Sequence, residues 1–285
     1  MNIGFIGLGV MGRPMALHLL EAGYRLGVYA RRPDSAAPLV TAGASFSSTP
    51  AELASQSDVV ITMVTATADV EEVLLGNNGV LTGAKPGSTV IDMSTIAPQA
   101  TERMAAALAA KQVRMLDAPV TGGPAGAEAA TLTIMVGGDP SVLDEVRPVL
   151  ERLGRQIVYM GSHGAGQIAK ACNQLALLVN AEGVAEALAL GARYGLDPHT
   201  LRQALLGGIA ASRVLEVFGE RMAERQFTPG MPTRLYDKDL NIVLDLAREA
   251  GQRLPAATVV RKHIDEMMAR GDANRDLAAL IQTLE

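Results

Sequence analysis

The feature that most constrains the fold is a run of three glycines, Gly7, Gly9 and Gly12, near the N-terminus of the 285-residue chain. The apolar segment 2–6 before them predicts a strand, and the segment 10–23 after them predicts a helix. At this spacing the first glycine permits a tight turn, the second lets a pyrophosphate approach the backbone, and the third lets helix and strand pack closely. The alternative is a glycine turn with a purely structural role.

The helix that opens at this turn adds a second reason to expect a dinucleotide. Its first N–H groups have no intrahelical partner and lie at the positive end of the helix dipole, where phosphates bind. The predicted cofactor-binding residues of the turn are Gly7, Leu8, Gly9, Val10, Met11 and Gly12.

Short β-branched segments alternate with helical patterns over the first half of the chain. The expected strands are 3–7, 25–30, 58–64, 88–94, 113–120, 131–138 and 156–161. The helices expected between them include 10–23, with Gly23 as a stop, 67–76 and 98–112. Such alternation predicts parallel βαβ units, and the few polar residues in the first strands are typical of a sheet covered on both faces. The fold class predicted is α/β, with an N-terminal, doubly wound Rossmann sheet.

The pattern changes near residue 163, after which only helices are expected. This predicts two domains, a nucleotide-binding domain over 1–162 and an all-helical domain over 163–285 for substrate binding and dimerisation. Segment 168–195 is apolar almost all round, which predicts a helix buried on most sides. Its glycines, Gly183 and Gly191, suit close helix packing, and Asp197-Pro198 restarts a helix.

Composition excludes several classes of protein. The net charge of -5 gives no reason to expect nucleic acid as a partner. We expect no apolar run long enough to span a membrane, and the glycine motif starts too early for a secretory signal, so a cytoplasmic protein is expected. The only cysteine, Cys172, is expected in the core, and no Cys/His cluster has the spacing of a metal site.

The end of the second strand indicates the type of cofactor. An NAD site usually has an acid there to bind the ribose 2′-hydroxyl, but this chain has Ala30, Arg31 and Arg32, with Asp34 only after a proline. Two guanidinium groups suit a 2′-phosphate, which favours NADP(H), with NAD(H) possible. The alternative is a pair of solvated surface arginines.

Ligands of such sheets lie beyond the carboxyl ends of the strands. Met63 and Val64, at the end of the strand expected over 58–64, are therefore expected at the cofactor. Ser94 and Thr95 follow another strand, and their hydroxyls either contact a ligand or cap the helix near Pro98.

Two further segments carry candidate chemistry. Thr121, Gly122 and Gly123 would expose successive N–H groups beside one hydroxyl, suited to a small carboxylate, although a flexible turn is the alternative. Lys170, Asn173 and Gln174 share one face of the long helix because they are three and four residues apart. Burial of this lysine would depress its pKa towards neutrality, as a general acid/base requires, whereas the alternative is a lysine that snorkels to solvent.

Taken together, the four segments 4–16, 117–132, 164–174 and 236–247 resemble the β-hydroxyacid dehydrogenase family, which includes the 3-hydroxyisobutyrate dehydrogenases. They resemble, in order, its nucleotide fingerprint, substrate loop, catalytic segment and cofactor-closing segment. The resemblance covers essentially the whole chain. It implies a Rossmann domain and a helical domain joined by a long helix, assembled as homodimers or homotetramers.

The resemblance also implies roles for individual residues. Lys170 would be the general acid/base, and Asn173 would orient the reacting oxygen. The substrate would be bound by Thr121, Gly122, Gly123 and Gln174. Thr95 and Lys238 would line the cofactor site.

Segments 172–188 and 207–230 most resemble the tartronate semialdehyde reductases within the family, which implies tartronate semialdehyde and glycerate as the favoured substrate pair. The alternatives are 3-hydroxyisobutyrate, L-serine or another 3-hydroxy acid. The family usually carries serine where this chain has Thr121, which adds a methyl group to the pocket. A non-catalytic NADP-binding protein is the alternative of another class.

Overall fold

The computed structural model describes all 285 residues, which form two compact units, Met1–Lys170 and Ala171–Glu285. The division falls inside helix α9 (Ala165–Arg193) rather than at the expected 162/163 boundary. The reason is that backbone N–H groups of Gly164 and Gln167, at the start of this helix, donate to a carboxylate of the sheet, so its first turn belongs to the sheet unit.

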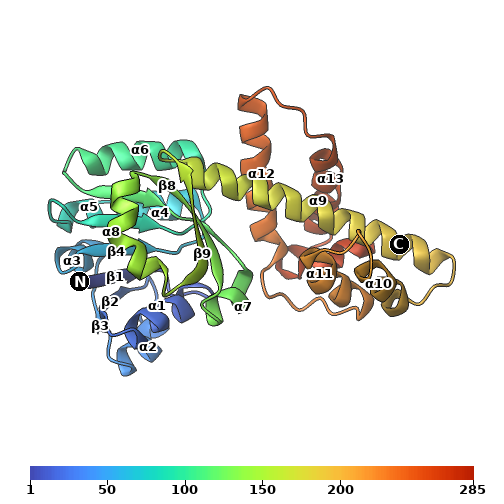
Figure 1. The fold of residues 1–285 in the computed structure, drawn as a ribbon, viewed down its shortest axis with the longest axis horizontal. Helices are drawn as coiled ribbons and strands as arrows, with labels where there is room; N and C mark the ends of the chain where they lie inside the picture. The colour runs from blue at the N-terminus through green and yellow to red at the C-terminus, as the bar shows by residue number, and fades with distance from the viewer. The chain divides into compact units, whose positions relative to one another are not determined.

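Unit 1 is a mixed sheet with helices, as Figure 1 shows. Its strands are β1 (Asn2–Ile6), β2 (Arg25–Tyr29), β3 (Ser45–Phe46), β4 (Val59–Thr62), β5 (Thr89–Asp92), β6 (Arg114–Asp117), β7 (Val120–Thr121), β8 (Leu132–Gly138) and β9 (Gly154–Gly161). Its helices are α1 (Gly12–Glu21), η1 (Pro33–Ala36), α2 (Ala37–Thr41), α3 (Pro50–Ser55), α4 (Thr67–Leu75), α5 (Val80–Gly83), α6 (Pro98–Ala109), α7 (Gly123–Glu128) and α8 (Pro140–Leu150).

The strand order is β3-β2-β1-β4-β5-β6-β8-β7, with β9 paired to β8. From β3 to β6 all pairs are parallel, which confirms the doubly wound Rossmann fold. The chain order reverses between β1 and β4, the place where such sheets bind their ligands. Beyond these parallel pairs, β8 runs antiparallel to β6 and β7.

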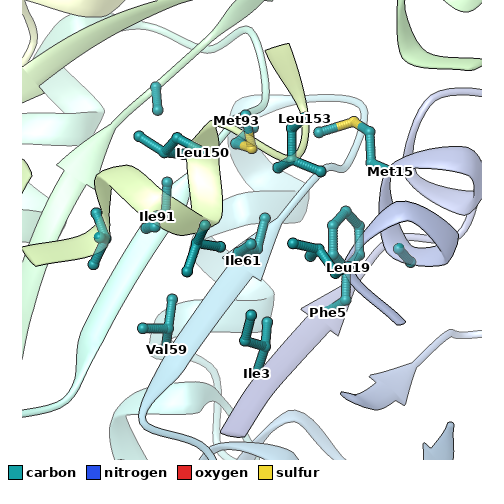
Figure 2. Packing of buried hydrophobic residues seen from close by; sticks show 14 of the residues in the cluster. Ile3, Phe5, Met15, Leu19, Val59, Ile61, Ile91, Met93, Leu150 and Leu153 are labelled. Carbon is teal, nitrogen blue, oxygen red and sulfur yellow. The ribbon is translucent and has the colours of Figure 1, made fainter. Parts of the chain in front are cut away.

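The central strands are buried because successive side chains enter different hydrophobic clusters. Val59 and Ile61 of β4 join the cluster of Figure 2, whereas Val60 belongs to a second cluster. The first cluster also holds Met15 and Leu19 of α1. This alternation follows from the two-residue period of a strand and explains why β4 has no polar face.

Unit 2 is helical, as expected. It holds the rest of α9, followed by α10 (Pro198–Leu206), α11 (Arg213–Ala223), α12 (Thr233–Glu249), α13 (Pro255–Ala269), η2 (Asp272–Asn274) and η3 (Leu277–Thr283). The restart at Asp197 is confirmed, because its carboxylate accepts from the backbone N–H of Thr200 at 2.8 Å and caps α10.

Several expectations about α9 were wrong. Leu190 is 62% exposed and Cys172 is also exposed, so neither the burial of the helix on most sides nor the core position of the cysteine holds. Gly183 faces open space, whereas a Cβ at Gly191 would collide with Leu201 of α10, so only the second glycine serves close packing.

The expectation that no segment is long and apolar enough to span a membrane was also wrong. Helix α9 meets that criterion by length and composition. One side of it packs into the hydrophobic cluster of unit 2, through Ala171, Leu178, Ala181, Val184, Ala185 and Leu188. This packing is the ordinary arrangement of a core helix in a folded domain.

Candidate active site

The three glycines of the first turn have the geometry that a dinucleotide requires. Gly7 has a φ of +99°, and a Cβ there would collide with the carbonyl of Met63. A Cβ at Gly12 would collide with the Gly7 carbonyl, so this glycine allows the close approach of α1 to the turn. Gly9, by contrast, has no atom within 4 Å of a Cβ position, which leaves its backbone accessible. The open side lies at the glycine expected to meet a pyrophosphate.

The N-terminus of α1 supports the same fit. Its N-cap, Met11, makes no side-chain capping bond, and its first turn carries no acidic residue. The first N–H groups of the helix are therefore left without a capping side chain and beside no negative charge, as anion binding requires. Leu8 is buried under the turn, while Val10 is 66% exposed. The residues present fit a dinucleotide.

The end of β2 carries the two arginines on its surface. Ala30 is buried, and Arg31 and Arg32 are exposed. The Arg31 guanidinium lies 3.1 Å from the carboxylate of Asp69 in the first turn of α4. Sequence reasoning missed this acid because 38 positions separate it from Arg31 (69 − 31). Asp69 orients Arg31 without burying it, because 75% of the arginine side chain stays exposed.

Ser94 does not cap α6. The N-cap of that helix is Ala97, without a side-chain bond, and its N–H donates to Thr67 Oγ1 at 3.2 Å. The Ser94 hydroxyl is fully buried and accepts from the N–H of Val64 at 3.0 Å, which joins the segments after β4 and β5. Thr95 is half-buried between Ser94 and Ile96. The structure thus places Met63, Val64 and Thr95 on joined segments of unit 1.

Asp92, at the end of β5, is a buried carboxyl group beneath the Ser94–Thr95 segment that sequence reasoning missed. Its Oδ1 accepts from Thr62 Oγ1 at 2.7 Å and from the N–H of Ser94 at 3.2 Å, while its Oδ2 has no hydrogen-bond partner. Burial raises the pKa of this carboxyl to about 6, although the bonds from Ser94 and Thr62 oppose the shift. The signal available was a lone acid at the end of an apolar strand.

The raised pKa of Asp92 predicts a pH-dependent stability. Because the folded state binds this proton more tightly than the unfolded state, the stabilisation is complete below about pH 4 and is lost as pH rises through about 6. We expect the free energy of unfolding of Asp92→Asn, measured relative to that of wild type, to rise by roughly 2–3 kcal/mol as the pH is raised from 4 to 7. Urea denaturation across this range measures the difference. Exposed Asp144→Asn is the control, and parallel curves for wild type and Asp92→Asn would contradict the prediction.

The loop after β7 is shaped by two glycines. Gly122 and Gly123 have φ values of +131° and +63°, a region that other residues rarely adopt. No atom lies within 4 Å of a Cβ position at Gly123, so the backbone there is accessible. Thr121 is half-buried at the end of β7 and pairs with Thr133 of β8. The loop therefore offers N–H groups and a hydroxyl, as expected for a carboxylate site.

The first turn of α9 is anchored on the sheet by Asp117, at the end of β6. Its two carboxylate oxygens accept from the N–H groups of Gly164 at 2.9 Å and Gln167 at 3.0 Å. Burial raises the pKa of Asp117, while these two hydrogen bonds oppose the shift. Lys170 is one turn further along the helix and is only 7% exposed. This low exposure disfavours a snorkelling lysine, which would extend its charged end into solvent.

Asn173 and Gln174 belong to unit 2 and take part in one chain of polar contacts there. Gln174 Nε2 donates to Asp239 Oδ2 at 2.6 Å, and its Oε1 accepts from Asn173 Nδ2 at 2.9 Å. Lys238 Nζ lies 2.9 Å from Asp239 Oδ1. Because a carboxylate can only accept, Asp239 sets the orientation of the Gln174 amide and, through it, that of Asn173. Asp239 lies within segment 236–247, but its contact with Gln174, 65 positions away, could not be predicted from the sequence.

The site combines three features. A glycine turn at the switch point of a Rossmann sheet fits a dinucleotide, polar side chains lie at the carboxyl ends of β4, β5, β6 and β7, and a buried lysine lies near the start of a helix anchored on that sheet. His163 takes no part, since its ring nitrogen contacts the Met115 carbonyl at 2.9 Å. A dinucleotide fold with a buried acid/base candidate defines the class of NAD(P)-dependent oxidoreductases.

Comparison with known proteins gives the family. Residues 2–161 match the NAD-binding domain of 6-phosphogluconate dehydrogenase, and residues 164–284 match the NAD-binding domain of NADP-dependent 3-hydroxyisobutyrate dehydrogenase. The chain is 43% identical to the 2-hydroxy-3-oxopropionate reductase of Escherichia coli, over 100% of this chain and 97% of that protein.

Two further relatives carry other substrate names. An NAD-dependent L-serine dehydrogenase of Pseudomonas aeruginosa is 38% identical over 98% of this chain and 96% of its own length. A solved structure of the Mycobacterium tuberculosis 3-hydroxyisobutyrate dehydrogenase with L-serine is 33% identical, has a TM-score of 0.91, and aligns over 100% of this chain and 99% of that one. The chain belongs to the 3-hydroxyisobutyrate dehydrogenase family and is an NAD(P)-dependent β-hydroxyacid dehydrogenase.

Proposed function

We propose that the chain is an NADP(H)-preferring reductase that interconverts tartronate semialdehyde and glycerate, with Lys170 as general acid/base. The observation that carries the catalytic part is Lys170 itself, a lysine only 7% exposed on a helix anchored to the ends of the sheet strands. The substrate rests on the 43% identity with a 2-hydroxy-3-oxopropionate reductase, since the two names describe the same compound. NADP(H) rests on Arg31 and Arg32.

Each group has a defined task in this proposal. A bound nicotinamide supplies the hydride when the aldehyde is reduced. Lys170 donates a proton to the carbonyl oxygen as negative charge develops on it, and takes that proton back in the oxidising direction. The loop of Thr121, Gly122 and Gly123 holds the substrate carboxylate through N–H groups and a hydroxyl. Asn173, oriented through Gln174, holds the reacting oxygen, while Thr95 and Lys238 line the cofactor site.

The runner-up substrates are 3-hydroxyisobutyrate, L-serine and other 3-hydroxy acids, which the names of two relatives favour. A panel of these compounds with NADP(H) and NAD(H), followed by absorbance of the reduced nicotinamide, tests the proposal. We expect the highest kcat/KM for tartronate semialdehyde with NADPH. A higher kcat/KM for another hydroxy acid would show that this compound, and not tartronate semialdehyde, is the preferred substrate. If no panel member is turned over, the proposed activity is refuted.

The carboxylate role of Thr121 has its own test. We expect Thr121→Ala to raise KM for carboxylated substrates about tenfold, because one hydrogen bond to a charged group is lost, and to change NADPH affinity little. Thr121→Ser is the matched control, since it keeps the hydroxyl and removes only the methyl group. Steady-state kinetics measures both variants. An unchanged KM in Thr121→Ala would show that the carboxylate binds elsewhere.

We also propose that the chain forms homodimers or homotetramers. Support comes from large apolar side chains that unit 2 exposes, namely Leu190, Tyr194, Leu196 and Ile209. Apolar surface of this kind is usually covered by a partner. We expect light scattering to give a mass of two or four chains, and Leu190→Asp to lower it. A single-chain mass for the wild type would contradict the proposal.

A further inference from the structure

Gln167, in the first turn of α9, contacts the peptide groups on both sides of Thr95. Its Oε1 accepts from the N–H of Ile96 at 3.1 Å, and its Nε2 donates to the carbonyl of Ser94 at 2.8 Å. The residue is only 1% exposed. A primary amide that pairs at once with a donor and an acceptor fixes its own orientation and the backbone that it meets. The Thr95 segment is therefore held by one buried side chain.

The same residue is tied to the helix start. Its backbone N–H donates to Asp117 at 3.0 Å, and Lys170 follows three residues later on the same helix face. A shift of Gln167 along or around the helix axis would move Thr95 and Lys170 together. A break in its side-chain contacts would let them move apart.

The Thr95 segment has a second anchor on its other side. The Ser94 hydroxyl accepts from Val64, and the Ser94 N–H donates to Asp92. These contacts join the segment to the ends of β4 and β5, whereas Gln167 joins it to α9. Each broken contact in such a buried network leaves an unsatisfied polar group away from water, so the network favours one arrangement of the segment.

We infer that Gln167 is a positioning residue that sets the spacing between Thr95 at the cofactor and Lys170 at the reacting oxygen. The inference rests on the proposed function for the roles of those two residues. Gln167 itself acts through the backbone around Thr95. Loss of the Gln167 side-chain contacts should therefore weaken dinucleotide binding and slow the chemical step. Both effects should exceed those of a substitution that lowers only the stability of the fold.

The test is a double-mutant cycle between Gln167→Met and Thr95→Ala. Methionine keeps the volume of the side chain and removes both hydrogen bonds. We expect Gln167→Met to lower the single-turnover rate of hydride transfer about tenfold and to raise the Kd of NADPH severalfold, as measured by calorimetry. In the Thr95→Ala background the effect on Kd should vanish, because coupled residues do not contribute additively.

The control separates positioning from stability. Val149→Ala, a buried substitution in α8, should lower Tm comparably and leave the Kd of NADPH and the hydride-transfer rate unchanged. If Gln167→Met does not fold, Gln167→Glu keeps the acceptor for Ile96 but lacks the donor for Ser94. Gln167→Glu should also lower the single-turnover rate of hydride transfer.

The outcomes are distinct. Wild-type Kd and rate in a folded Gln167 variant with a lowered Tm would show a purely structural role and overturn the inference. If Gln167→Met raises the Kd of NADPH equally in the wild-type and Thr95→Ala backgrounds, Gln167 does not act through Thr95, and the inference is overturned. If the wild type reduces no panel substrate, the proposed function fails, but the calorimetric cycle with NADPH still tests the coupling on its own.

Discussion

Replacing Lys170 with alanine is expected to lower kcat about a thousandfold and to leave the Kd of NADPH nearly unchanged. The reason is that a positioned general acid contributes about 10²–10⁴ to the rate and acts only as charge develops on the reacting oxygen. The buried position of Lys170 excludes bulk solvent as an efficient substitute. Single-turnover absorbance of NADPH measures the chemical step, and calorimetry measures cofactor binding.

Two further variants sharpen this prediction. Lys170→Arg keeps the positive charge but does not release its proton at working pH, so it should be as inactive as alanine. Full activity of the arginine variant would indicate an electrostatic role instead of proton transfer. Lys262→Ala, on the exposed side of α13, is the matched control and should behave as wild type. Unchanged turnover in Lys170→Ala would remove the mechanism altogether.

The second large effect is expected at the end of β2. Arg31→Ala combined with Arg32→Ala should raise the Kd of NADPH about a hundredfold and alter that of NADH far less, because each charge-assisted bond to a phosphate is worth about 1.5–3 kcal/mol. Fluorescence titration with both reduced cofactors measures the difference. Fold stability should hardly change, since the Arg31 side chain is 75% exposed and an ion pair at such a position contributes little.

The control for this pair is Arg25→Ala, at the opposite end of the same strand. It removes an exposed arginine of the same sheet and should affect neither cofactor. Single variants separate the two side chains, because only Arg31 is held by Asp69. An equal loss of affinity for NADPH and NADH in the double variant would show that the arginines do not contact the 2′-phosphate.

Local signals predicted much of the fold. Gly23, with a φ of +85°, lies just after the end of α1, and Asp197 caps α10. The apolar segments of the first half form β1, β2, β4, β5 and β6. These features depend on neighbours within one turn or one strand, so they can be read from a short stretch of sequence. Strand β3 was missed because it has only two residues, both exposed.

Part of the site could not be predicted in this way. Asp117 meets Gln167 across 50 positions, and Gln174 meets Asp239 across 65. Each of these side chains has a polar partner far away in the sequence, and no local pattern shows which one. The burial of α9 was misjudged for a related reason, because an apolar helix can be covered by its own domain or by a partner, and the sequence does not say which.

The sequence by itself determined the glycine turn, the strand–helix alternation, the family resemblance and the common helix face of Lys170, Asn173 and Gln174. These depend on backbone conformation and on the fixed period of a helix. Only the tertiary structure decided that Lys170 is buried, that Ser94 joins two strand ends instead of capping a helix, and that Gln167 holds the Thr95 segment. Burial and hydrogen-bond partners are set by segments that meet only when the chain has folded, which is why they could not be read from the sequence.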